Sequence, residues 1–170
     1  PRLSLRWLLP DNSSIKAGYS YNYQYVHLTA LSAVSLPTDI WYPTTDIAKP
    51  QIGYQASVGY FKNFFDDVLE TSVEIYYKKM NNMIEYREGA LPGDNVNDNT
   101  DNLLVFGEGW SYGIEFFIKK SLGDFTGWIG YTWAKSDRLF PDLNGGELYA
   151  AKYDRRHDLS VVGSYKLNDR

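Results

Sequence analysis

Apolar and polar residues alternate along several segments of the chain, most clearly over residues 15–25. The odd positions of this segment are Ile, Ala and four Tyr, whereas its even positions are Lys, Gly, Ser, Asn and Gln. Side chains of a β-strand point to opposite faces in turn, so the pattern predicts a strand with one apolar and one polar face. The same alternation recurs over residues 3–9, 52–60, 69–78, 110–119, 129–134 and 159–166. The sequence therefore predicts seven strands and no helix.

The connections between these strands alternate in length. Short turns rich in Asn, Asp, Gly and Ser fall at residues 10–14, 63–67 and 121–124, and long connections run through 27–50, 87–102 and 137–156. This sorting is typical of an antiparallel up-and-down transmembrane β-barrel, with turns at one rim and loops at the other. Most segments reach the length of about 9–11 residues that a tilted strand needs to cross a membrane. Residues 69–86 and 103–120 form longer segments, which we expect to project past the membrane on the loop side.

The composition supports this interpretation over a soluble all-β protein. Aromatic residues make up 16% of the chain and tyrosine occurs 15 times, although the mean hydropathy is negative. Aromatic girdles and a polar lumen account for that combination better than a dry core does. The chain has no cysteine and a net charge of -4, which argues against disulfides, thiolate metal sites and a nucleic-acid partner. No apolar run is long enough for a transmembrane helix.

Alternation also assigns residues to the two faces of the predicted wall. The residues expected to face the lumen are Gln55, Ser57, Glu70, Glu74, Glu115 and Lys119. Those expected to face lipid are Tyr19, Tyr21, Tyr54, Ile75 and Ile114. Glu70 and Glu74 share a face with Lys78, and we expect them to balance lumenal charge because no apolar pocket is implied around them.

The densest polar cluster is formed by residues 153–158, and it allows two interpretations. An enzyme could use His157 as a base oriented by Asp154 or Asp158, but no serine or cysteine nucleophile in a recognisable setting accompanies it. We therefore predict no catalytic residue and interpret the cluster as a salt-bridged strand entry at the outer rim. Its members are Asp154, Arg155, His157 and Asp158. His27, the second histidine, is expected to face water.

Two further patterns lie in the predicted outer loops. Asp94, Asp98 and Asp101 could offer oxygen ligands to Ca²⁺, but their order lacks the Gly and terminal Glu of an EF-hand loop, so we predict a solvated loop without a metal. Aromatic residues among Pro, Thr and Asp can instead capture a solute or pack a long loop onto itself. The candidates for solute contact are Trp41, Tyr42, Phe140 and Tyr149.

Several segments, in order, resemble TonB-dependent outer-membrane receptors, particularly those of Bacteroidetes. Residues 70–86 (ETSVEIYYKKMNNMIEY) are similar to the family's strand with an S-x-E-x-Y-Y-K core, and residues 107–115 (GEGWSYGIE) to its G-x-G-x-S-x-G-x-E strand start. Residues 127–132 (GWIGYT), followed by Ser136 and Arg138, resemble the next strand, and residues 153–159 (YDRRHDL) resemble its Y-D-x-x-H strand entry. Residues 49–51 resemble a return from a loop into a strand.

The resemblance implies a bacterial outer-membrane protein whose barrel has about 22 strands around a plug domain. Because the plug, a TonB-engaging segment and the closing strand are not in these 170 residues, we expect an internal part of one barrel domain. The family implies a parent that imports a siderophore, cobalamin or glycan with energy supplied by TonB, without a cofactor. Its implied partners are outer-membrane lipid, the TonB complex and the solute, and the resemblance leaves a surface lipoprotein open. A passive or adhesive barrel that binds a partner through its loops is the alternative.

Overall fold

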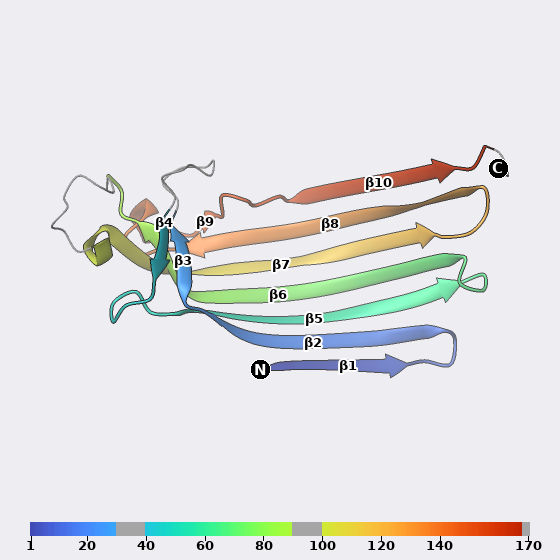
Figure 1. The fold of residues 1–170 in the computed structure, drawn as a ribbon, viewed down its shortest axis with the longest axis horizontal. Coiled ribbons are helices and arrows are strands. Elements are labelled where there is room, and N and C mark those ends of the chain that lie inside the picture. Colours follow the sequence, from blue (N-terminus) through green and yellow to red (C-terminus); the bar gives the residue numbers. More distant parts are fainter. Residues whose placement is uncertain (30–39, 90–99, 168–170) are drawn as a thin grey trace.

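The structure is a computed structural model that describes residues 1–29, 40–89 and 100–167. Its main element is one curved antiparallel sheet, in which seven strands follow one another in chain order (Figure 1). These strands are β1 (Arg2–Leu8), β2 (Ser13–Gln24), β5 (Gln51–Phe64), β6 (Leu69–Tyr86), β7 (Leu104–Lys120), β8 (Phe125–Leu139) and β10 (His157–Tyr165). They coincide with the seven segments predicted from alternation, and each pairs antiparallel with the next strand along this path.

Three short strands were not predicted. β3 (Val26–Thr29) and β4 (Ile40–Pro43) pair as a separate hairpin, and β9 (Tyr149–Ala150) adds to β8. All three lie in the predicted long connections and are too short to show a clear alternation. The other elements are the 3₁₀ turns η1 (Thr100–Leu103) and η2 (Asn144–Gly146). No helix among the described residues is long and apolar enough to span a membrane.

The two ends of the sheet differ as the loop lengths predict. The short turns after β1, β5 and β7 gather at one end, called the short-turn end below, and the long connections gather at the other, the outer rim (Figure 1). Asn12 and Gly123 allow tight turns at the short-turn end because both adopt positive φ, 57° and 97° respectively. The β3–β4 hairpin lies across the outer ends of the strands.

Strand register divides the sheet into two chemically distinct faces. Residues directly opposite in antiparallel strands share a face, so each row of partners across the sheet can be followed strand by strand. One row consists of Ala17, Val58, Ile75, Ile114 and Trp133. The next row, one residue along each strand, consists of Lys16, Gly59, Glu74, Glu115 and Thr132. The face of the sheet that carries the first row is called the apolar face below, and the face that carries the second row is called the polar face.

A β-bulge interrupts this division near the outer rim of β6. Met80 lies opposite Gly109, but Met83 lies opposite Gly107, so β6 has one extra residue there. The extra residue reverses the alternation of β6, and beyond the bulge Ile84 lies opposite Phe106. Asn82 adopts a φ of 55° in the bulge and donates its side-chain N–H to the carbonyl of Pro50, at 3.0 Å.

The buried hydrophobic residues lie at the outer rim and not under the sheet. Two clusters occur on the extended β6–β7 ribbon: Met83, Val105, Phe140 and Leu143 in the first, and Ala48, Ile84 and Leu104 in the second. By contrast, the apolar face packs against no other part of the chain that the structure describes, as the 50% exposure of Ile75 illustrates. A continuous exposed apolar surface of this kind marks a contact with another phase or molecule.

Candidate functional site: the polar face and the outer rim

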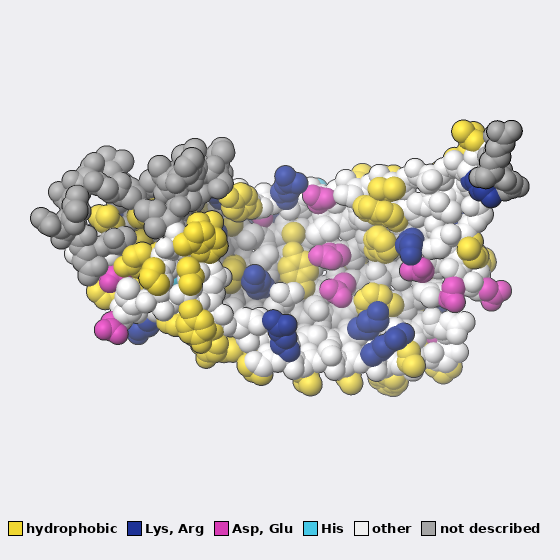
Figure 2. Space-filling model, in the orientation of Figure 1, with side chains coloured by type: hydrophobic (Ala, Val, Ile, Leu, Met, Phe, Trp, Pro, Cys, Tyr) yellow, Lys and Arg dark blue, Asp and Glu magenta, His cyan; other side chains and the backbone are white. Residues whose placement is uncertain are grey.

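The polar face forms a hollowed surface that carries charged side chains in separate groups (Figure 2). Its acidic centre is the pair Glu74 and Glu115, which lie directly opposite each other on β6 and β7. Like charges in directly opposed positions destabilise a sheet. Neither carboxylate has an ion-pair partner within the described parts of the chain. The pair therefore leaves unbalanced negative charge on the polar face.

Gly59 makes room for the Glu74 carboxylate on the neighbouring strand. A Cβ atom at Gly59 would lie 3.2 Å from Oε2 of Glu74 and 2.8 Å from the ring of Phe61. The Lys16 ammonium lies 3.8 Å from the centroid of that ring, within the range of a cation–π interaction, and Gly59 separates Lys16 from Glu74 in the row. This arrangement keeps the cation of β2 apart from the acidic pair.

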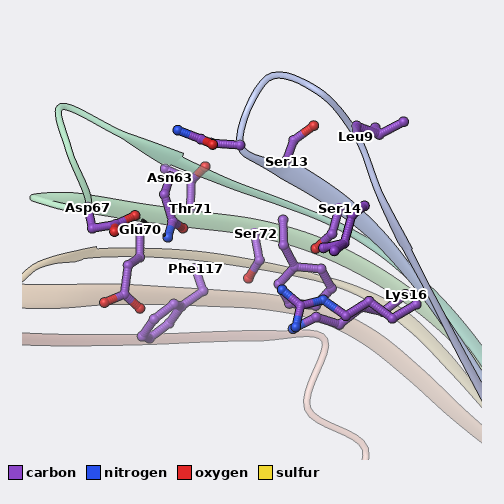
Figure 3. A pocket seen from close by; sticks show the side chains of 14 residues that line it. Leu9, Ser13, Ser14, Lys16, Asn63, Asp67, Glu70, Thr71, Ser72 and Phe117 are labelled. Atoms are coloured by element: carbon purple, nitrogen blue, oxygen red, sulfur yellow. Dashed lines mark hydrogen bonds between the residues drawn. The ribbon is translucent and has the colours of Figure 1, made fainter.

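A recess of about 680 Å³ opens on the polar face near the short-turn end (Figure 3). Lys16 extends into it from one side, and Phe117 and Glu70 line the other. Arg6, the cross-strand partner of Lys16, also lines this recess. Glu70 is already neutralised, because its Oε1 lies 3.2 Å from Nζ of Lys119.

The residues expected to face the lumen lie on the polar face, and those expected to face lipid lie on the apolar face. Gln55 is opposite Lys78, and Ser57 follows it on the same face of β5. Tyr19 is opposite Ala56, and Tyr21 is opposite Tyr54, in the apolar rows toward the outer rim. That these two faces meet water and lipid stays a prediction, tested below by labelling.

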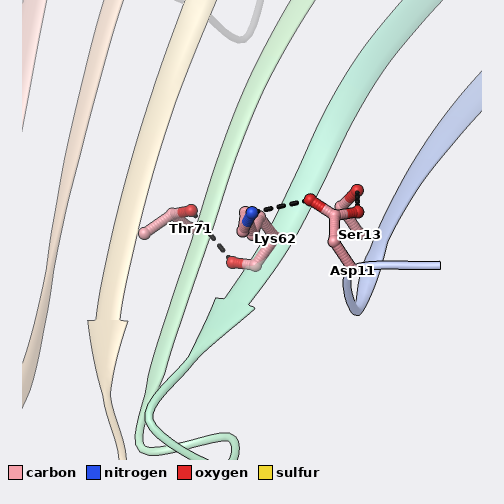
Figure 4. A network of polar contacts seen from close by, with 4 residues as sticks. All are labelled: Asp11, Ser13, Lys62 and Thr71. Atoms are coloured by element: carbon pink, nitrogen blue, oxygen red, sulfur yellow. Dashed lines mark hydrogen bonds and ion pairs between the residues drawn. The ribbon is translucent and has the colours of Figure 1, made fainter. Parts of the chain in front are cut away.

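An ionic contact fixes the first short turn to β5 (Figure 4). The Lys62 ammonium lies 2.7 Å from Oδ2 of Asp11, and the Ser13 hydroxyl donates to Oδ1 at 2.5 Å. The hydrogen bond from Lys62, followed by that from Ser13, lowers the pKa of Asp11 to about 2. Thr71 of β6 donates its hydroxyl to the Lys62 carbonyl at 2.9 Å, which links the turn to a third strand.

The four aromatic candidates for solute contact occupy different environments at the outer rim. Trp41 is 65% exposed on β4 and is free to meet a solute. Phe140 is completely buried in the first rim cluster, so it cannot contact a solute; here the loop packs onto the sheet instead. Tyr149 is half-buried against that cluster, with its ring 6.4 Å from that of Phe140, and burial raises the pKa of Tyr149.

Tyr42 is half-buried and connects the β3–β4 hairpin to the next loop. Its hydroxyl donates to Oδ1 of Asp101 at 2.8 Å, and Thr45 donates to the same carboxylate at 3.0 Å. Burial and then the Asp101 hydrogen bond raise the pKa of Tyr42 to about 12.

Of the three aspartates considered as Ca²⁺ ligands, Asp94 and Asp98 lie outside the residues that the structure describes. Those described residues contain no group of three side chains that could hold a metal ion.

His27 is buried, with 2% exposure, and the expectation that it faces water was wrong. Alternation alone could not show that the His27 side chain is buried at the outer rim, because the β3–β4 hairpin that carries it was not predicted. Burial lowers the pKa of His27, and a hydrogen bond to the Lys49 backbone opposes this shift only in part. The ring Nε2 is buried without a hydrogen-bond partner.

The predicted rim cluster is divided between the two faces of the sheet. Asp154 accepts the backbone N–H of Ser136 at 2.7 Å and pairs with Arg156 at 3.1 Å, which fixes the return of the loop to β8. Arg155 is exposed and lies 3.4 Å from Asp158, on the polar side opposite Thr132. His157 lies opposite Trp133 in an apolar row, and its Nδ1 is 2.8 Å from the Tyr131 hydroxyl.

Sequence reasoning did not single out several charged residues that the fold brings together. Arg6 and Lys16 form a cross-strand pair on the polar face, and their even positions in alternating segments were the available signal. At the outer rim, Arg138 forms an ion pair with Glu85. No local pattern predicts that contact, because it depends on the bulge that turns Glu85 onto the polar side.

Comparison with known proteins gives a consistent family and fold. The family model described as "TonB dependent receptor-like, beta-barrel" matches residues 1–168. No curated protein sequence matches the chain. A similar solved structure is the ferripyoverdine receptor of the outer membrane of Pseudomonas aeruginosa, bound to ferripyoverdine. The two share 20% sequence identity with a TM-score of 0.66, over 99% of this chain and 20% of the receptor, so the chain spans about a fifth of that protein. With a whole-length family match, an open antiparallel sheet and the expected loop sorting, this chain belongs to the TonB-dependent receptor family of outer-membrane proteins and forms part of the β-barrel.

Proposed function

We propose that the parent protein is an energised importer of a large, scarce solute: a siderophore, cobalamin or glycan. The solute binds at the outer loops, and TonB, driven by the inner-membrane proton gradient, pulls on a plug domain to open a path along the polar face. The observation that supports this proposal most directly is the unbalanced pair of Glu74 and Glu115. A cationic surface of a domain that fills the lumen would offset their repulsion, whereas an empty pore offers only water.

The arrangement of the outer rim supports solute capture at this end. The buried clusters hold the loops against the β6–β7 ribbon, and Trp41 remains exposed on the β3–β4 hairpin at this rim. A preformed surface with an exposed aromatic side chain binds with little ordering cost. A surface lipoprotein, if the parent has one, would cover the same rim.

Uptake by the parent protein tests the proposal. Cells that express it receive three probes in turn: radiolabelled cobalamin, an iron-loaded siderophore and a fluorescent oligosaccharide. We expect uptake of one probe, its loss in a strain without TonB, and a decrease on E74Q/E115Q with the receptor still present in the outer membrane. Uptake that persists without TonB contradicts the proposal.

The second candidate function is a passive or adhesive outer-membrane barrel that holds a partner through its loops. The outer rim has loops fixed by a buried cluster and an exposed aromatic side chain, Trp41. These features support partner binding as well as they support import. Binding of a probe at the cell surface without uptake of any of the three, whether or not TonB is present, favours this alternative.

We further infer that the parent performs no hydrolytic chemistry at the strand entry of β10. His157 lies on the apolar face beside Tyr131, and no serine or cysteine nucleophile approaches it in the hydrogen bonds of the described residues. H157A should leave any hydrolytic activity of purified parent protein unchanged. Loss of such an activity on this substitution would overturn the inference.

A further inference from the structure

Three cations lie together on the polar face of β1 and β2. Arg6 is directly opposite Lys16, and Arg2 lies four residues from Arg6 on the same face of β1, about 13 Å away at strand geometry. None of the three forms an ion pair with a described residue. Arg2 makes only a weak hydrogen bond, at 3.4 Å, to the amide of Asn22.

The wall around these cations is polar but contains no carboxylate. The neutral polar side chains of β1, β2 and β5 that face the same way include Ser4, Ser20, Asn22, Gln55, Ser57 and Asn63. Hydroxyls and amides can donate hydrogen bonds to an oxygen-rich solute without adding charge. This part of the wall therefore has a net positive charge with neutral hydrogen-bonding groups between the cations.

Recesses follow one another along this wall from the outer rim toward the short-turn end. One of about 210 Å³ is lined by Asn22, Gln55 and Lys78, and a neighbour of about 380 Å³ shares Gln55 and contains Arg2. The recess of about 680 Å³ in Figure 3 follows, with Arg6 and Lys16. Its acidic members, Asp67 and Glu70, are engaged by Asn63 and Lys119 respectively.

The polar face of β6 and β7 has the other sign at the level of Lys16. Glu74, Glu115 and Asp158 lie in one row across β6, β7 and β10, the same row that contains Lys16 on β2. Asp158 of that row is paired with Arg155, and Lys78 is a further cation of β6 toward the outer rim. Gly59 separates Lys16 from these acids. An anion at the level of this row is therefore attracted to the cations of β1 and β2 and repelled from Glu74 and Glu115 on β6 and β7.

We propose that the wall formed by β1, β2 and β5 is the path of an anionic, oxygen-rich solute from the outer rim to the short-turn end. The spacing of the cations suits this role, because an anion between two cations about 13 Å apart is never more than about 7 Å from one of them, which is less than the Debye length of about 10 Å at 0.1 M salt. This inference rests on the proposed import function and narrows it to solutes that carry carboxylate, phosphate or similar negative groups.

The local potential can be measured in the full-length parent receptor without knowing the solute. The chain has no cysteine, so, with any cysteine elsewhere in the parent replaced, S57C places one fluorescent label on β5 at the recess that contains Arg2. A second reporter, T132C, places the label between Glu115 and Asp158 in the acidic row. Quenching of each label by iodide, an anion, is compared with quenching by neutral acrylamide at low salt.

The ratio of iodide to acrylamide quenching should be higher at position 57 than at position 132. R6Q/K16Q should lower the iodide-to-acrylamide ratio at position 57 by roughly twofold for each charge removed, as expected for unit charges about 8 Å (Lys16) and about 12 Å (Arg6) away in water at low salt. K62Q is the matched control: Lys62 lies on the apolar face of the same strand, about 17 Å from position 57, so the ratio should change much less than in R6Q/K16Q.

Three results would overturn the proposal. Equal ratios at the two labels, or no response to R6Q/K16Q, would mean that the cations create no anion-attracting wall. In the third result, both iodide and acrylamide quench the label at position 57 only weakly, and quenching by both increases in R6Q/K16Q. That result would mean that an acidic protein surface covers the cations. Because quenching requires neither TonB nor uptake, these outcomes are independent of the test of import.

Discussion

Phe140 is the side chain on which the packing of the last outer loop most depends. It has no exposed surface and contacts the cluster of Met83, Val105 and Leu143. The fit extends to the backbone beneath it, because a Cβ atom at Gly107 would lie 2.5 Å from Cγ of Phe140. We predict that F140A detaches this loop from the β6–β7 ribbon while the sheet stays folded.

The size of the effect follows from the burial of Phe140. An aromatic side chain buries at least about 150 Å², which at about 25 cal/mol per Å² is worth roughly 4 kcal/mol. Measured costs of Phe→Ala in protein cores are about 3–5 kcal/mol. Since each 1.4 kcal/mol is a factor of ten, the equilibrium constant for local opening should rise by about 10² to 10³ or more.

Hydrogen exchange of the full-length receptor in detergent measures this opening directly. The reporters are the amides of Leu143, Ala151 and Asp154, which donate to Phe140, Ser136 and Ala151 at 3.1, 2.8 and 2.8 Å. Their exchange should accelerate in F140A up to the unprotected rate, and amides in the middle of β5 and β6 should not change. W41A is the control, because a side chain that is 65% exposed contributes little to folding. Unchanged exchange of the three reporters in F140A would refute the reasoning.

Three other outcomes are expected. Spin labels at position 75 should report lipid and those at position 74 water; the reverse would show that the faces are assigned wrongly. Burial lowers the pKa of His27, so its neutral form stabilises the β3–β4 hairpin above pH 6.5 and this stability is lost as the pH falls further; exchange of hairpin amides should accelerate toward pH 5, and H27N should remove the dependence. The pKa of Tyr42 is raised to about 12, so its contribution is complete below pH 10 and is lost as the pH rises through 12; Y42F should abolish this alkaline loosening, and an unchanged profile would assign it to another group.

The sequence alone determined the seven strands of the main sheet and, up to the bulge in β6, their faces. A period of two residues identifies a strand and divides its side chains locally, without knowledge of any neighbour. For this reason Glu74, Glu115 and Ile75 could be placed on their faces from alternation, and the lengths of the connections predicted which end carries the loops.

Only the tertiary structure decided which residues meet across the sheet and at the outer rim. The opposition of Glu74 to Glu115 and of Arg6 to Lys16 depends on register, which is set by neighbouring strands and turns. The burial of Phe140 and His27 depends on loops that fold back over a ribbon bulged after Met80. Such contacts join residues far apart in the chain, so no local pattern encodes them, and they decide which charges and aromatic side chains remain available to a solute.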